Sequence, residues 1–219
     1  MADTYRVYGG PGSGSVAVEA AMTLLALPYT TVDAASWCGP DAKALAGQVN
    51  PLGQVPTVEL PDGRLMTESA AILLMLGDLK PEAGLAPGST DRARPDYLRW
   101  MVYVPVNIYS MFLLRDAPSI WFDDQDDQDH LRERALERIK SCWRVMEAWS
   151  LGADTPWLLG ERMTLLDLYV TVVSRWSPRR RWFYDACPRL SEIVRKIDAL
   201  PKLQAFWAKR FPFEEGWEG

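Results

Sequence analysis

The sequence predicts a chain of two units, an α/β unit at the N-terminus and an all-helical unit at the C-terminus. Short strand-like and helix-like segments alternate over the first 80 residues. Beyond about residue 91, apolar residues recur at helical spacing and no alternating strand pattern appears. Residues 81–94, rich in proline and glycine, read as a linker. We therefore expect the two units to span residues 1–80 and 91–219.

The first three elements predict a βαβ unit. Residues 5–8 read as a short strand, and residues 9–15 form a loop rich in glycine. From Val16 onward, apolar residues at positions 18, 21, 22 and 25 mark one face of an amphipathic helix. Residues 29–32 read as a second strand. This order favours parallel pairing of the two strands.

A hairpin and a helix complete the expected α/β unit. Residues 34–48 look loosely organised, with a short helix over residues 41–46. Residues 57–60 and 64–66 read as two strands, joined by the turn-forming run Pro61-Asp62-Gly63. A helix is expected from about Ser69 to Leu79.

The C-terminal unit is predicted from two apolar stripes and one helix start. One stripe runs over residues 131–149 and comprises Leu131, Ala135, Ile139, Cys142, Met146 and Trp149. A second comprises Leu190, Ile193, Val194 and Ile197. Thr164 and Asp167 have the spacing of a capping box, which stabilises a helix start and carries no chemistry.

Composition excludes several classes of protein. The chain has 219 residues, 48% of them hydrophobic, and no apolar run long enough to span a membrane. Its N-terminal residues show no secretory signal. Three cysteines at irregular spacing indicate reduced thiols in a cytoplasm. A net charge of −5 argues against nucleic acid, and a single histidine, His130, argues against histidine-rich metal sites and Ser-His-Asp triads. We expect a cytoplasmic protein without a metal.

Two short motifs carry the functional information. Asn50-Pro51-Leu52-Gly53-Gln54-Val55-Pro56-Thr57 places a Val-Pro step just before a strand, where the proline requires a special turn. If that bond is cis, Val55 turns its backbone N–H and C=O towards an open groove. Thr67-Glu68-Ser69 opens an apolar helix, whose free N–H groups attract a carboxylate, while Glu68 can hold an ammonium group. Together they suit a small zwitterionic peptide. Taken singly, each motif is better explained as an ordinary turn or helix cap.

These two motifs in register resemble the glutathione-binding half of the cytosolic glutathione transferase family. The resemblance implies a thioredoxin-like N-terminal domain, a helical C-terminal domain, glutathione as co-substrate and a homodimer with a role in detoxification. It implies that Val55 and Pro56 pair with the cysteinyl backbone of glutathione and that Glu68 and Ser69 hold its γ-glutamyl end. Gln54, in the same segment, and Trp37, in the loop after the second strand, are further expected contacts to glutathione.

The loop after the first strand is where the family activates the thiol. Pro11-Gly12-Ser13-Gly14-Ser15 resembles the Pro-Gly-Ala-Cys-Ser run of the bacterial beta class, but Gly14 stands at the cysteine and Gly12 at the serine position of other classes. A thiol has a pKa near 8.5, so a donor is needed to favour the thiolate at neutral pH. Ser13, Ser15 and Tyr8 are the candidate catalytic donors, and backbone N–H groups of the loop are an alternative.

The opposite wall of the groove is expected from the first long helix of the second unit. By resemblance, Tyr109 stands in place of a polar beta-class residue that faces the substrate, and Tyr103 and Asn107 are further candidates for a hydrophobic substrate pocket. Core or dimer packing is the alternative for each of these side chains.

The resemblance implies attack of the glutathione thiolate on a small apolar electrophile. The alternatives are glutathione-dependent disulfide reduction and a non-catalytic glutathione-binding or interaction protein.

Three further segments have simpler interpretations. Trp37-Cys38-Gly39-Pro40 contains part of a thioredoxin-type motif, but Asp41 replaces its second cysteine and the segment follows the second strand, so Cys38 reads as a surface thiol. The aspartates between residues 123 and 129 read as a solvated loop before a helix. Residues 179–181, three consecutive arginines, read as a solvated face.

Overall fold

The N-terminal unit contains a small sheet and three α-helices. The computed structural model describes residues 4–150 and 155–213. The elements of this unit are β1 (Tyr5–Gly9), α1 (Ser15–Leu24), β2 (Tyr29–Asp33), η1 (Ser36–Cys38), α2 (Pro40–Val49), β3 (Thr57–Glu59), β4 (Leu65–Met66) and α3 (Ser69–Leu79).

The sheet has the order β2-β1-β3-β4. Strands β1 and β2 pair in parallel, which confirms the predicted βαβ unit. β1 and β3 are antiparallel, with Tyr8 opposite Thr57, and β3 and β4 form the predicted hairpin, with Val58 opposite Met66. Gly63 in its turn has a φ of 83°, a left-handed conformation that glycine adopts without steric cost.

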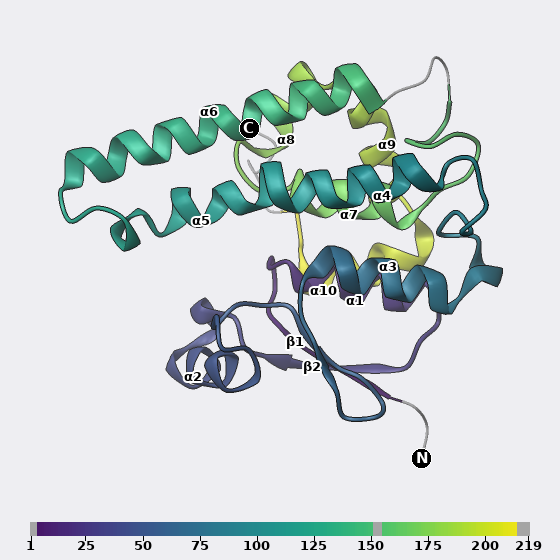
Figure 1. Cartoon of the computed structure of the whole chain (residues 1–219), viewed down its shortest axis with the longest axis horizontal. Helices are drawn as coiled ribbons and strands as arrows, with labels where there is room; N and C mark the ends of the chain where they lie inside the picture. The colour runs from purple at the N-terminus through teal and green to yellow at the C-terminus, as the bar shows by residue number, and fades with distance from the viewer. Residues whose placement is uncertain (1–3, 151–154, 214–219) are drawn as a thin grey trace.

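The second unit is helical, as predicted. Apart from an isolated bridge between Trp157 and Gly160, no strand occurs in its described part. Its longest helix lies antiparallel above the α4–α5 stretch (Figure 1). The elements are η2 (Pro81–Ala83), α4 (Arg94–Tyr103), the π-helical η3 (Val104–Tyr109), α5 (Ser110–Asp116), η4 (Pro118–Ile120), α6 (Gln125–Ser150), α7 (Leu165–Val173), α8 (Arg179–Ala186), α9 (Pro188–Asp198), η5 (Pro201–Leu203) and α10 (Gln204–Arg210).

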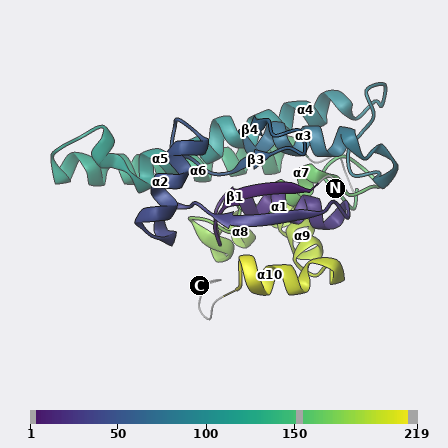
Figure 2. The same ribbon diagram turned by 90° about the horizontal axis from the view of Figure 1, so that it is seen from below.

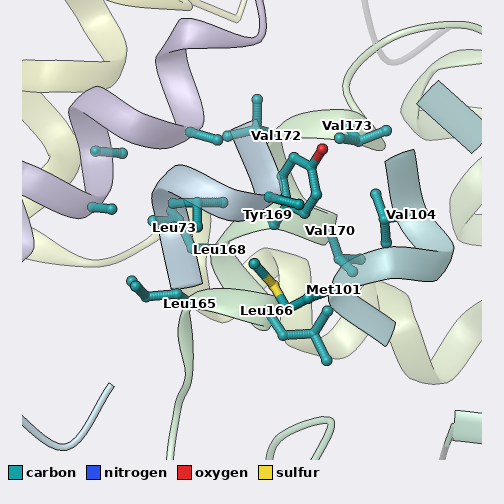
Figure 3. Packing of buried hydrophobic residues seen from close by; sticks show 14 of the residues in the cluster. Leu73, Met101, Val104, Leu165, Leu166, Leu168, Tyr169, Val170, Val172 and Val173 are labelled. Atoms are coloured by element: carbon teal, nitrogen blue, oxygen red, sulfur yellow. The ribbon is translucent and has the colours of Figure 1, made fainter. Parts of the chain in front are cut away.

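One continuous core joins the two units. Helices α1 and α3 lie between the sheet and the helices of the second unit (Figure 1), and every residue of α7 is buried. Figure 3 shows α7 side chains packed against Leu73 of α3 and against Met101 and Val104 from the α4 side. Helix α10 lies at the edge of the molecule (Figure 2), and Arg210 at its end contacts Glu19 of α1.

The capping box of α7 forms as expected. The Thr164 side chain accepts from the backbone of Asp167, and the Asp167 carboxylate accepts from the backbone N–H of Thr164 at 2.6 Å. The same carboxylate also accepts the N–H of Leu158 at 2.9 Å. Burial raises the pKa of Asp167 to about 6, although these hydrogen bonds oppose the rise.

Three expectations need correction. The helix expected over residues 41–46 runs from Pro40 to Val49, because Pro40 is suited to the first turn of a helix. Trp149 ends the stripe of α6 but is 74% exposed. Arg180 is fully buried rather than solvated, and it pairs with Asp198 at 3.1 Å. The boundaries 1–80 and 91–219 stay a prediction.

Two expectations drawn from the composition, on membrane spans and on the cysteines, can be compared with the structure. No helix among the described residues is long and apolar enough to cross a membrane. Cys38, Cys142 and Cys187 are all free thiols, and Cys38 alone of the three is exposed. The expected cytoplasmic location stays a prediction.

Candidate functional site

Strand register brings three separate motifs to one edge of the sheet. Because Tyr8 lies opposite Thr57, one further step places Gly9 level with Pro56. Because Val58 lies opposite Met66, two further steps place Glu68 level with Pro56. The glycine-rich loop, the Val-Pro step and the start of α3 therefore meet at the same end of the sheet.

The Val55-Pro56 bond is cis. Asn50 shapes the approach to it, since its side-chain amide donates to the Gln54 carbonyl at 3.0 Å and its oxygen accepts the Leu52 N–H at 3.0 Å. Within the described residues, neither the N–H nor the C=O of Val55 has a hydrogen-bond partner. Val55 therefore offers one donor and one acceptor to an extended peptide.

Glu68 and Ser69 stand at the start of α3. Glu68 has a φ of 65°, an uncommon conformation for a residue with a side chain, and its carboxylate is exposed. The N–H groups in the first turn of α3 face away from the helix and suit an anion. The Ser69 hydroxyl is 2.7 Å from the hydroxyl of Tyr169 on α7, so the second unit fixes this side chain.

Ser13 and Ser15 form a buried chain of hydroxyl groups within the loop. Their Oγ atoms are 2.8 Å apart, and Ser15 donates to the Glu19 carboxylate at 2.6 Å. Both serines are almost completely buried. Arg210 of α10 holds Glu19 through two contacts of 2.6 and 2.9 Å.

Residues from the far end of the chain also hold the loop. The Gly12 N–H donates to the carbonyl of Arg210 at 2.9 Å, and the indole of Trp176 donates to the Gly12 carbonyl at 2.8 Å. The loop conformation therefore depends on two segments of the second unit.

Tyr8 and Trp37 lie on different sides of this loop. The Tyr8 ring packs with Ala34 and Ala46, and its hydroxyl donates to Glu59 at 3.0 Å. This is the α2 face of the sheet, opposite α1. Trp37 is 64% exposed, and its indole donates to the Pro11 carbonyl at 3.2 Å, which places it at the rim of the loop.

Tyr109 projects from η3 onto the start of α1. A Cβ placed on Gly14 would lie 2.1 Å from the Tyr109 hydroxyl oxygen, so the hydroxyl fills the space that a side chain at position 14 would need. The ring packs on Trp176 with centroids 4.8 Å apart. Burial raises the pKa of Tyr109 far above its ordinary value, the Glu68 carboxylate adds to the rise, and a hydrogen bond from the Gly14 N–H opposes it. The hydroxyl is therefore protonated at neutral pH.

Tyr103 and Asn107 are less directly placed. The Tyr103 hydroxyl donates to the Cys142 carbonyl at 2.9 Å and so joins α4 to α6. The Asn107 oxygen accepts from Arg138 at 3.4 Å, and both Tyr103 and Asn107 are half-buried. Pro105 lacks an N–H, and the π-helical turn at this point changes the helical phase that orients Tyr109.

Four residues of this site are absent from the sequence-based expectations: Glu19, Tyr169, Trp176 and Arg210. Glu19 carries a usable signal, because it is a single charge within the apolar run Val16-Ala17-Val18-Glu19-Ala20-Ala21-Met22. The other three act across the two units, and no local pattern marks them.

The described residues contain no cluster of three or more histidine, cysteine or acidic side chains arranged to hold a metal ion. The aspartates between residues 123 and 129 are exposed and precede or begin α6, where negative charge is favourable.

Comparison with known proteins gives one family over both units. The description "Glutathione S-transferase, N-terminal domain" matches residues 15–79, and "Glutathione S-transferase, C-terminal domain" matches residues 116–210. An Escherichia coli K12 protein named "Uncharacterized GST-like protein YncG" is 36% identical over 200 residues, covering 91% of this chain and 95% of that protein. "Glutathione S-transferase GST-4.5" of Xanthomonas campestris is 29% identical, over 78% of this chain and 82% of that protein.

A solved structure agrees with this result. A glutathione transferase homologue from Sulfitobacter, with bound glutathione, matches with a TM-score of 0.81 and 27% identity, covering 95% of this chain and 99% of that chain.

Proposed function

The chain belongs to the glutathione S-transferase family, and from this premise we propose that it binds glutathione and conjugates its thiolate to small apolar electrophiles. The resemblance to the beta class, and Gly14 as the position of that class's cysteine, remain parts of this proposal.

The unpaired backbone of Val55 is the observation that carries the proposal. Within the described residues, Val55 has both backbone polar groups unpaired beside a cis proline, whereas most backbone groups of a folded chain are paired. The backbone of a cysteinyl residue supplies one matching acceptor and one matching donor. Glutathione therefore fits Val55 as a short added strand.

The two ends of glutathione match the charges on either side of Val55. Glu68 accepts the γ-glutamyl ammonium group, and the first turn of α3 with Ser69 binds the adjacent carboxylate. At the other end, the exposed residues Trp37, in η1, and Gln54, just before Val55, are proposed to contact the glycyl group.

Tyr103, Asn107 and Tyr109 are proposed to line the side where the electrophile binds. All three lie on one helical stretch from α4 to η3, of which Tyr109 contacts the start of α1. Tyr109 presents an aromatic ring to this side, which suits an apolar partner.

We also propose a homodimer. Leu98, Val102 and Val106 are 38%, 54% and 60% exposed and form a row at a spacing of four residues along α4 and η3. A row of exposed aliphatic side chains suits a second copy of the chain. Light scattering after gel filtration measures the mass directly, and a monomer at micromolar concentration contradicts this part.

Calorimetric titration with glutathione tests the binding site. Replacing Glu68 by Gln removes one charge without changing shape, and we expect the affinity for glutathione to fall about tenfold, equivalent to about 1.4 kcal/mol. Glu133→Gln, at an exposed position on α6, is the matched control and should leave the affinity unchanged. Equal affinities for wild type and Glu68→Gln would contradict the assigned site.

Two activity assays separate the possible functions. Conjugation of a chloronitrobenzene supports the proposed reaction, whereas reduction of hydroxyethyl disulfide without conjugation supports a reductase. Glutathione binding with neither activity supports a binding protein. No retention on immobilised glutathione would overturn the proposal as a whole.

A further inference from the structure

Between Gly10 and Val16, every backbone N–H group of the glycine-rich loop is already engaged within the protein, so none is left to donate to a ligand. The N–H of Gly10 donates to both serine Oγ atoms at 3.2 Å, and that of Ser13 to the Gly10 carbonyl at 3.1 Å. The remaining backbone N–H groups also donate within the protein: that of Gly12 to the Arg210 carbonyl, that of Gly14 to the Tyr109 hydroxyl oxygen, that of Ser15 to the Ser13 hydroxyl, and that of Val16 to the Ser13 carbonyl. Pro11 has no N–H to offer.

The two serine protons are engaged as well. Ser15 has one hydroxyl proton, and the 2.6 Å contact directs it to Glu19, which is already paired with Arg210 and accepts only. The proton in the 2.8 Å contact between the serines must then come from Ser13. Ser13 and Ser15 therefore act together to hold the loop, and neither directs a proton outward.

The Tyr109 hydroxyl is different, because its proton has no acceptor within the described part of the chain. Its oxygen accepts the Gly14 N–H, which leaves the O–H free to donate. The oxygen occupies the space from which a side chain at position 14 would project, at the N-terminus of α1.

Sheet register directs the substrate sulfur to the same place. The pairing of β1 with β3 ends at Tyr8 and Thr57, and continuing its register by two residues on each strand brings Gly10 towards Val55. A cysteinyl residue paired with Val55 therefore lies beside the loop that leads to Gly14.

We propose that Tyr109, from the second unit, provides the catalytic hydroxyl and donates a hydrogen bond to the glutathione sulfur. This proposal rests on the proposed binding of glutathione at Val55. The thiol S–H bond breaks with its proton passing to water, and the thiolate accepts the Tyr109 O–H. The sulfur electron pair then forms the bond to the electrophilic carbon, and a halide or other leaving group departs with the electrons of its bond. Tyr109 keeps its proton throughout, as a hydroxyl with a raised pKa does.

Tyr109→Phe tests this assignment, because it removes the hydroxyl and keeps the ring against Trp176. One hydrogen bond to an anion lowers the pKa of a bound thiol by about 1 to 2. We therefore expect the ultraviolet titration of the bound thiolate to move up by about that amount. The kcat/KM at pH 7 should fall about 10- to 100-fold, and the pH profile should move in the same direction. Glutathione affinity should change less than threefold.

Tyr97→Phe is the matched control. Tyr97 lies on α4, its buried hydroxyl has no hydrogen-bond partner among the described residues, and it is not part of the proposed site. This variant should keep the wild-type titration.

Gly14→Ala supplies a second test from the other side of the contact. An added Cβ at 2.1 Å forces the Tyr109 hydroxyl away, so this variant should raise the bound thiol pKa as Tyr109→Phe does. If the hydroxyl is the shared cause, the two changes together should raise it no further.

The outcomes are distinct. An unchanged thiol titration in Tyr109→Phe, with wild type binding and conjugating glutathione, overturns the role of Tyr109 and leaves the proposed function intact. A rise in Ser13→Ala that equals or exceeds that in Tyr109→Phe overturns it in favour of Ser13. Failure of wild type to bind glutathione overturns the proposed function itself.

Discussion

Replacing Glu19 by Gln should destabilise the whole protein and disturb the loop at the same time. Glu19 is fully buried on α1, and its carboxylate neutralises Arg210, whose side chain is 8% exposed. Gln keeps an oxygen for Ser15 but leaves the guanidinium without its buried counter-charge. The remaining carboxylate is that of Asp33, 3.6 Å away and 59% exposed.

The expected loss follows from this geometry. Breaking a buried ion pair by removing one partner costs about 3 to 5 kcal/mol. Because Asp33 still gives Arg210 a weak, solvated partner, we expect the lower end, about 3 kcal/mol. Added salt should leave the loss nearly unchanged, since the pair is shielded from solvent.

Urea denaturation followed by tryptophan fluorescence measures the free energy of unfolding, with ten tryptophans as reporters. The control replaces both Glu19 and Arg210 by Met, which removes both charges, and should recover most of the loss. A loss below about 1 kcal/mol in Glu19→Gln, or a double variant as unstable as the sum of the two single ones, would refute the reasoning.

Two further predictions concern the second unit. The pKa of Asp167 is raised from 3.8 to about 6 in the folded protein, so between these values the folded state holds a proton that the unfolded state releases. Lowering the pH from 7 to 4 should therefore stabilise wild type relative to Asp167→Asn by up to about 3 kcal/mol. Urea denaturation at each pH measures this difference. A constant difference between the two proteins would contradict it. Tyr169→Phe removes the 2.7 Å contact to Ser69 and should weaken glutathione binding about three- to tenfold by calorimetry, with Tyr97→Phe unchanged; equal affinity would show that Ser69 needs no support from α7.

Local chemistry made much of the fold predictable. The run Pro61-Asp62-Gly63 fixes a turn, so the hairpin and the start of α3 follow within a few residues. Thr164 and Asp167 specify a helix start in the same way, since both partners of the capping box lie within one turn. Val55, Glu68 and Ser69 could be proposed as site residues for a similar reason, because each belongs to a contiguous motif.

Contacts between distant segments were not predictable. Arg180 belongs to a run of three arginines, and its burial depends on Asp198, which the sequence does not mark as its partner. Trp149, the last residue of the predicted apolar stripe, is 74% exposed, and the guanidinium of Arg99 on α4 lies over its ring. The fit of Tyr109 against Gly14 depends on the π-helical turn at η3 and on the docking of two units.

The contacts that hold Gly12 determine when, during synthesis of the chain, the glycine-rich loop can reach its final conformation. Trp176 lies between α7 and α8 and Arg210 is the last residue of α10, so in a nascent chain the glycine-rich loop gains its second contact at Gly12 only after residue 210 has been translated. A premature stop just before α10 would thus spare Trp176 and every residue proposed to contact glutathione, but it would remove the Arg210 carbonyl that accepts the Gly12 N–H.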